Sequence, residues 1–428
     1  MLGFSSLLTK WPAEATKDGS EPSGHPVGNS AIEYLPTIDG LRGIAILLVA
    51  WYHAPFLFRD STGFPQEIFQ GILQRIFWGM STAGWVGVDL FFVVSGFLIT
   101  SILLRSQEAK RSLQVFWYRR GLRILPLAML YLVVLKLNTA FGDPIGILQD
   151  FDGWLAYLFY FGNVHIALNG WQPIVVMILW SLAVEEQFYV FWPVLVHYLS
   201  RRKLFLLSLS VIALSPLARS LVYPASGYPA VYVLTICHLD ALASGAVLAL
   251  LLSNQSWKPH TISSCRKLAP FASVVLLTTF LVPFSPSFPH TRPLMFTLFG
   301  YTWIAIALAI MVGAGIECQG WTRSLLSNSA LMFIGKRCYG FYLWHALVAG
   351  VAKKLVDTFS LDIGFYGQLS LWLVGLLVVA TVSWTFFERP ILNLKRLVPY
   401  TFGPQAFPAS LDTSLAKSDL RHLHAADR

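Results

Sequence analysis

The sequence predicts an all-α fold, a polytopic membrane bundle of about ten transmembrane helices plus one re-entrant or interfacial segment. Hydrophobic residues make up 55% of the 428-residue chain and charged residues only 12%, about half the share usual in soluble domains. Mean hydropathy is +0.60, and long apolar runs recur along most of the length. These runs lack the period-two alternation of barrel strands, so we expect helices, which satisfy their backbone groups within each span.

The predicted spans are apolar stretches of roughly 17 residues or more, separated by polar loops. They cover residues 41–58, 84–104, 124–141, 179–199, 204–222, 230–252, 268–285, 295–316, 338–356 and 365–387. Residues 154–168 are also apolar, but this stretch is short and is broken by Gly162 and Asn163. We therefore assign it as the re-entrant or interfacial segment.

Clusters of Lys and Arg predict the orientation, because short cytoplasmic loops are enriched in these residues. The clusters are Arg105 to Arg123, Arg201 to Lys203, Lys258 to Lys267, Arg323 to Arg337 and Arg389 to Arg396. They fall on one side of the membrane only if residues 154–168 do not cross it, and Lys353 and Lys354 are the exception. We expect a multi-pass protein of the plasma (inner) membrane with both termini in the cytoplasm.

Three parts are expected along the chain. Residues 1–33 form a polar cytosolic tail without the apolar core of a signal peptide. Residues 34–391 form the membrane domain, and the polar residues 392–428 form a second cytosolic tail, predicted to be disordered.

Cysteine and charge usage narrow the chemistry. The four cysteines stand singly, at Cys237, Cys265, Cys318 and Cys338, so neither a metal site nor a disulfide framework is indicated. The net charge of +9 is explained by the loop clusters. The aromatic and zinc-finger patterns of nucleic-acid binding are absent from the sequence, so a nucleic-acid partner is not expected.

The first predicted span lies largely within "DGLRGIAILLVAWYH", residues 39–53, which carries Arg42 and His53. Eleven residues turn a helix by about 20° beyond three full turns, so both side chains share one face, roughly 16 Å apart along the axis. Arg42 at the cytosolic edge has the geometry to grip a phosphate, and His53 deeper in the membrane has the chemistry of a general base. A snorkelling arginine and a packed histidine remain the alternative.

Further polar residues interrupt later spans, where ionisable groups are costly and indicate function. Asp89 lies in "GVDLFFVVSGFLIT", in which Ser95-Gly96 favours close helix packing over a nucleophile because the G-x-S-x-G motif is missing. In "FWYRRGLRILP", Arg120 and Arg123 lie on neighbouring helix faces, a spacing suited to two phosphates.

Adjacent carboxylates occur in "WSLAVEEQFYVFWP", at Glu185 and Glu186. Neighbouring helical residues point about 100° apart, so at most one of them faces a given cavity. His238, Asp240 and His345 add polar groups to two other helices, and their roles stay open.

These segments together resemble the acyltransferase-3 family, integral membrane enzymes that O-acylate carbohydrates and other hydroxylated molecules. The matching segments, in the family's order over residues 34–391, are "YLPTIDGLRGIAILLVAWYH", "GVDLFFVVSGFLIT", "FWYRRGLRILP", "WSLAVEEQFYVFWPVL", "HLDALASGAVLA", "CYGFYLWH" and "FFERP". The chain departs from the family at His238, where Arg is common, and at Cys338, where Ser is commoner. A soluble SGNH-type domain is not seen after residue 391.

The resemblance implies that His53 is the catalytic histidine and that Arg42, Arg120 and Arg123 bind acyl-CoA. It maps the family's glutamate to Glu185, and we expect Glu185 or Asp89 to orient the histidine or to bind sugar hydroxyls. The implied reaction moves an acyl group, acetyl by default, from acyl-CoA to a hydroxyl of a glycan, glycolipid or related acceptor. Acyl-CoA enters as a co-substrate, and neither a resident cofactor nor a metal is expected.

Two other classes of function remain open at this point. A transporter or flippase of a glycan, lipid or acyl species would line its path with the same buried charges. A non-catalytic membrane scaffold would leave Arg42, His53 and Glu185 without a role.

Overall fold

The computed structural model shows a bundle of helices, as the sequence predicts. In the described residues, the only β pairing is an isolated bridge between Lys110 and Thr401. The described residues are 35–57, 81, 83–148, 151–281 and 294–401.

Within the described part of the chain, seven helical segments are long and apolar enough to cross a membrane. They are α4 (Val86–Ser106), α5 (Ser112–Ala140), α8 (Ile174–Met177) with α9 (Leu179–Tyr198), α10 (Arg201–Val233), α11 (Thr235–Ser253), η1 (Phe296–Gly300) with α13 (Tyr301–Ile316), and the run of α17 (Gly364–Ser383), η2 (Trp384–Glu388), α18 (Arg389–Asn393) and η3 (Leu394–Leu397). The other three predicted spans fall in α2 (Pro36–Leu57), α12 (Lys258–Leu281) and α16 (Cys338–Thr358). The count of ten stays a prediction.

Two predicted boundaries differ from the structure. Helix α5 begins at Ser112 rather than at residue 124, because apolar side chains of its first turns, such as Phe116, pack in the core. Helix α10 runs on to Val233 across a kink at Gly227, whose φ of 72° only glycine adopts readily. The span predicted from residue 230 therefore begins at Thr235, as α11.

The predicted re-entrant segment forms two short helices, α6 (Trp154–Leu158) and α7 (Gly162–Asn169), each too short to cross a bilayer. The turn between them contains Tyr160, which has a φ of 58°. The amide of Gln187 donates to the Tyr160 carbonyl (2.9 Å) and to Asn163 Oδ1 (3.1 Å), and Asn163 donates to Thr235 Oγ1 (3.0 Å). These bonds fix the segment against α9 and α11.

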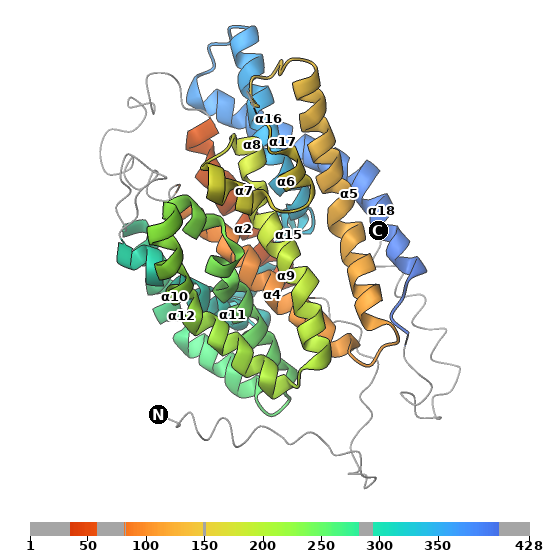
Figure 1. The fold of residues 1–428 in the computed structure, drawn as a ribbon, viewed down its shortest axis with the longest axis vertical. Coiled ribbons are helices and arrows are strands. Elements are labelled where there is room, and N and C mark those ends of the chain that lie inside the picture. Colours follow the sequence, from red (N-terminus) through yellow and green to blue (C-terminus); the bar gives the residue numbers. More distant parts are fainter. Residues whose placement is uncertain (1–34, 58–80, 82, 149–150, 282–293, 402–428) are drawn as a thin grey trace.

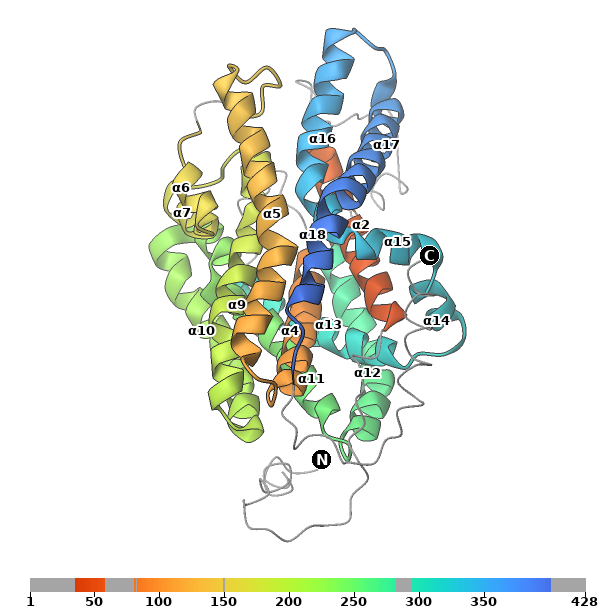
Figure 2. The same ribbon diagram turned by 90° about the vertical axis from the view of Figure 1, so that its right-hand side faces the viewer.

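Helix α4 lies at the centre of the bundle, packed against α2 and α11. Gly96 of α4 and Gly245 of α11 sit where any Cβ would collide with a backbone carbonyl of the other helix. The two backbones therefore cross closely, as the Ser95-Gly96 pair predicts. In both views α16 and α17 lie toward the top, and α10, α11 and α12 lie lower, beside α4 (Figures 1 and 2).

The predicted N-terminal tail, residues 1–33, and residues 402–428 of the predicted C-terminal tail lie outside the described residues. The described chain stays helical through Leu397, beyond the predicted end of the membrane domain at residue 391. Arg119 donates to the carbonyls of Val398 (3.1 Å) and Lys395 (3.4 Å) and stacks on Tyr400. The first residues of the predicted C-terminal tail are thus held against α5.

Candidate active site

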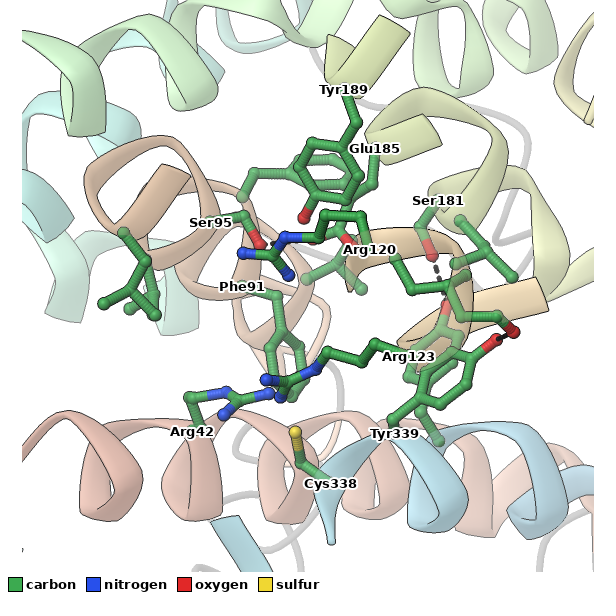
Figure 3. A pocket seen from close by; sticks show the side chains of 17 residues that line it. Arg42, Phe91, Ser95, Arg120, Arg123, Ser181, Glu185, Tyr189, Cys338 and Tyr339 are labelled. Carbon is green, nitrogen blue, oxygen red and sulfur yellow. Dashed lines mark hydrogen bonds between the residues drawn. The ribbon is translucent and has the colours of Figure 1, made fainter. Parts of the chain in front are cut away.

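A cavity of about 90 Å³ lies among α2, α4, α5, α9 and α16 (Figure 3). Its polar lining consists of Arg42, Ser95, Arg120, Arg123, Ser181, Glu185, Tyr189, Cys338, Tyr339 and Tyr342. The remaining lining is apolar and includes Val88, Phe91 and Phe92. Three arginines from two helices therefore share one pocket in the interior of a membrane protein.

Helix geometry accounts for the way the arginines are divided. Arg120 and Arg123, one turn apart on α5, both face the cavity, whereas Arg119 turns to the C-terminal segment. The Arg120 guanidinium lies over the Tyr189 ring, 5.1 Å from its centroid. In Figure 3, Arg42 and Arg123 extend toward one another from opposite sides above Cys338.

The positive charge of this cavity is incompletely balanced. Arg42 has an ion pair with Asp39 at 3.6 Å, on its own helix. Among the described residues, Arg120 and Arg123 have no carboxylate within 4 Å. Guanidinium groups that converge in a poorly hydrated site repel one another, and an anion between them relieves that repulsion.

The polar run 185–187 spreads to three different places, as helix geometry requires. Glu185 lines the cavity and accepts a hydrogen bond from Ser95 Oγ at 2.7 Å. Glu186 turns away, and its buried Oε1 has no hydrogen-bond partner among the described residues. Gln187 donates to the carbonyl of Tyr160, in the turn between α6 and α7. The prediction that one carboxylate at most faces a given cavity agrees with this arrangement.

A second cavity, of about 220 Å³, shares Arg42, Arg123 and Tyr339 with the first. Its other lining residues are Asp39, Lys336, Trp384, Glu388 and Leu392. Sequence reasoning did not single out Glu388, although it lies in the "FFERP" segment. It is buried in the π-helical turn η2 and accepts a hydrogen bond from Ser383 (3.0 Å). Arg42, Arg123 and Tyr339 therefore form the wall between two adjoining cavities.

His53 is buried outside the lining of both cavities. Its Nδ1 lies 2.9 Å from the Val49 carbonyl oxygen and 3.2 Å from Nε2 of His345, a fully buried residue of α16. His345 Nδ1 lies 2.5 Å from the carbonyl oxygen of Tyr342, whose side chain lines the first cavity. Tyr342 and His345 thus stand between the cavity and His53.

The carboxylates expected to orient His53 lie elsewhere. Glu185 is bonded to Ser95 in the cavity. Asp89 is buried outside the cavity lining, with Oδ1 at 3.6 Å from His238 Nδ1. His238 Nε2 lies 2.7 Å from the Tyr232 carbonyl oxygen, so this pair is a separate cluster.

Asp240 belongs to another buried network, built on Arg219. The Arg219 guanidinium donates to Asp240 Oδ2 (3.0 Å), to the carbonyls of Cys237 (2.6 Å) and Leu298 (2.8 Å), and to Thr302 Oγ1. Thr302 in turn donates to Asp240 (2.6 Å). Arg219 and Asp240 are almost completely buried, so this charge pair is satisfied within the protein.

Comparison with known proteins now bears on these residues. A family model described as an acyltransferase domain, Acyl_transf_3, matches residues 35–388. The chain belongs to the acyltransferase-3 family. That match includes every residue that lines the two cavities except Leu392.

Two curated proteins that are similar to this chain are named as peptidoglycan O-acetyltransferases, one of them provisionally. The peptidoglycan O-acetyltransferase OatA of Listeria monocytogenes is 29% identical over 375 residues, which is 84% of this chain and 56% of that protein. The Bacillus subtilis protein YrhL, provisionally named a peptidoglycan O-acetyltransferase, is 31% identical over 84% of this chain and 55% of its own length. The chain therefore spans little more than half the length of these relatives. The comparison with solved structures finds no match.

The structure brings two of the family's motifs together. Both arginines of the Arg-x-x-Arg motif and the arginine of the Arg-x₁₀-His motif line one cavity. Sequence reasoning missed Tyr189, Tyr339 and Tyr342 as lining residues, because aromatic residues of an apolar helix give no signal that separates cavity lining from packing. Cys338, noted as a departure from the family, lies in the cavity beside Arg42 and Arg123.

Proposed function

We propose that this protein is a membrane O-acetyltransferase that moves an acyl group, acetyl by default, from acyl-CoA to a hydroxyl of a glycan, glycolipid or related acceptor. Family membership and the O-acetyltransferase names of the relatives support the reaction class. We place the protein in the plasma membrane with both termini in the cytoplasm, as the distribution of Lys and Arg predicts.

The observation that carries the proposal is the arginine-lined cavity. Arg42, Arg120 and Arg123 bring three guanidinium groups to a pocket in which Glu185 is the only carboxylate among the described lining residues. Arginine is the side chain best suited to bind phosphate in two-point contacts. The pyrophosphate of acyl-CoA therefore fits between Arg42 and Arg123, where the two cavities meet.

The second cavity suits the nucleotide half of acyl-CoA. Lys336 adds a third cation to the arginines, and Trp384 and Tyr339 add aromatic rings for a purine. The carboxylates of Asp39 and Glu388 accept hydrogen bonds from ribose hydroxyls or an exocyclic amine. The pantetheine arm then extends into the first cavity, along Phe91 and Tyr342.

His53 supplies the chemistry in this proposal. Its Nε2 takes the proton of the acceptor hydroxyl while the oxygen attacks the thioester carbonyl. The carbon–sulfur bond then breaks and the CoA thiolate leaves. The proton taken from the acceptor is at that point on His53. His53 lines neither cavity, so the proposal requires the first cavity to extend past Tyr342 to the histidine when the acyl group arrives.

Acyl-CoA turnover by purified protein in liposomes tests the proposal. Wild-type protein should release CoA when a glycan acceptor is present, and His53→Ala should lower this rate by about 10³-fold, within the range for loss of a general base. Acetyl-pantetheine, which lacks the nucleotide, should react with a much higher KM. Lys336→Met should raise KM for acetyl-CoA and leave KM for acetyl-pantetheine unchanged.

A transporter or flippase is the rival function. Solute movement in liposomes without acyl-CoA binding or hydrolysis would favour it and contradict the enzyme. Normal turnover by a folded His53→Ala protein would remove that histidine from the mechanism and leave the donor site standing.

A further inference from the structure

The buried histidine pair gives His53 a partner that the sequence left without a role. We propose that His345 is the positioning residue that holds His53 in the tautomer and orientation needed for proton transfer. This inference rests on the function proposed above. Its evidence is the arrangement of hydrogen-bond acceptors around the two rings.

Backbone carbonyls determine where the ring protons lie. A carbonyl oxygen only accepts, so His345 Nδ1, at 2.5 Å from the Tyr342 oxygen, must carry a proton. In the neutral ring, His345 Nε2 is then a lone-pair acceptor, and it faces His53 Nδ1 at 3.2 Å. His53 Nδ1 also lies 2.9 Å from the Val49 oxygen, so that nitrogen carries a proton as well.

The reactive nitrogen of His53 follows from this assignment. With a proton on Nδ1, the neutral ring keeps its lone pair on Nε2, the nitrogen that a general base uses. Two acceptors, Val49 O and His345 Nε2, share the Nδ1 proton and fix the rotation of the ring. When Nε2 takes a proton, the same contacts become charge-assisted hydrogen bonds to the imidazolium.

His345 is held firmly enough to act in this way. Its backbone oxygen accepts from the indole of Trp372 on α17 at 2.8 Å, and Trp372 is almost completely buried. One turn earlier, the Tyr342 hydroxyl donates to the carbonyl of Ile178 (2.8 Å) and lies 2.5 Å from Ser181 Oγ. Contacts from α17, from α9 and from Ile178, between α8 and α9, therefore determine the position of the acceptor.

A neutral orienting group suits this location. Catalytic histidines are often oriented by a buried carboxylate, whose charge is costly in the interior of a membrane protein. The carboxylates Glu185 and Asp89 are bonded or paired elsewhere. A second imidazole accepts a hydrogen bond from the His53 Nδ1–H without adding a charge to the resting site.

Three variants test the inference in the full-length protein, with acetyl-CoA and a glycan acceptor. His345→Leu should lower kcat by about 100-fold with KM for acetyl-CoA unchanged, because the acceptor is lost. His345→Gln, whose amide oxygen reaches the same position, should stay within about tenfold of wild type. Trp372→Phe, which removes one of the contacts that hold His345, should lower kcat by about tenfold or less, with KM for acetyl-CoA unchanged.

Nitrogen-15 NMR of labelled histidines gives a readout that does not depend on activity. The His53 signal, identified by its absence from His53→Ala, should report the Nδ1–H form in wild type and in His345→Gln. In His345→Leu, where the Val49 oxygen is the acceptor that remains at Nδ1, it should shift part of the way toward a mixture of tautomers. A purely structural role for His345 would leave this signal unchanged.

The outcomes separate the two proposals. Wild-type kcat in a folded His345→Leu protein, or an equal loss in His345→Gln and His345→Leu, would overturn the positioning role. An unchanged His53 tautomer in His345→Leu would overturn it too. If wild type neither binds nor uses acetyl-CoA, the proposed function fails, and the NMR result still decides whether His345 sets the tautomer.

Discussion

Two groups of arginines in this bundle, one buried and one half-buried beside a cavity, differ in how their charge is matched. Arg219 is enclosed by acceptors from Asp240, Thr302 and two backbone carbonyls, and it does not line either cavity. Arg120 and Arg123 line a cavity, and neither guanidinium has a carboxylate within 4 Å in the described part of the chain. A satisfied arginine contributes to folding, whereas an unmatched arginine beside a cavity is a site for an anionic ligand.

The largest expected effect breaks the matched group. Arg219→Leu should destabilise the protein by about 3–5 kcal/mol, because it leaves Asp240 charged and buried without its partner. Thermal denaturation in detergent, followed by the monodisperse fraction on gel filtration, measures the loss. The double variant Arg219→Leu with Asp240→Leu should recover part of the stability. A single variant as stable as wild type would show that the network is not structural.

The second effect separates ligand binding from stability at the unmatched group. Arg123→Met should raise KM for acetyl-CoA by about 10–100-fold, as expected for the loss of a charged hydrogen bond to phosphate. Its melting temperature should stay level or rise, since one of two facing cations is removed. Added salt should weaken acetyl-CoA binding to wild type.

Arg119→Met is the matched control on the same motif. It should leave KM unchanged and lower stability by about 1 kcal/mol, because Arg119 binds the C-terminal segment rather than the cavity. If Arg119→Met and Arg123→Met raised KM equally, the distinction between the two sides of α5 would be lost.

The smallest effect concerns a matched carboxylate in the loop after α5. Asp143 accepts hydrogen bonds from Asn138 (2.5 Å) and from the amides of Gly146, Ile147 and Leu148. Partial burial raises the pKa of this carboxyl, but these hydrogen bonds outweigh burial and hold the pKa below its ordinary 3.8. Asp143→Ala should cost about 1 kcal/mol at neutral pH.

The pH dependence of that cost has a definite sign. A carboxyl whose pKa is lowered by folding contributes its full stability above the ordinary pKa and loses it as pH falls through the folded value. The difference in melting temperature between wild type and Asp143→Ala should therefore narrow below about pH 4. A difference that stays constant down to pH 2 would assign the effect to backbone conformation, since Asp143 has a φ of 52°.

Local spacing predicted much of the fold and part of the site. Apolar run length gave the helices, and the Arg-x-x-Arg spacing placed Arg120 and Arg123 on one side of α5, where they share a cavity. Apolar run length predicts a start for α5 that is too late, because charged residues lie between the buried side chains of its first turns and residue 124. It also did not locate the true boundary of α10, where helix continues through a kink at Gly227.

Partners distant in sequence were beyond such reasoning. His53 and His345 are 292 positions apart, and their contact depends on how α2 packs against α16. Arg219 lies alone in the apolar run "SPLARSLV", and its meaning appears only when Asp240 and Thr302 are brought beside it. Glu388 reaches the second cavity through the π-helical turn, which spacing rules for α-helices do not anticipate.

The segment that forms α6 and α7 has a consequence for the order in which the protein is assembled during synthesis. Its polar anchor joins Asn163 to Gln187 and to Thr235, and Thr235 is made 72 residues after Asn163. At roughly 5–20 residues per second, the ribosome needs about 4–14 s to supply that last partner. Until then the amide of Asn163 must be satisfied by water or headgroups, so docking of this segment is a late step in biogenesis that waits for α11.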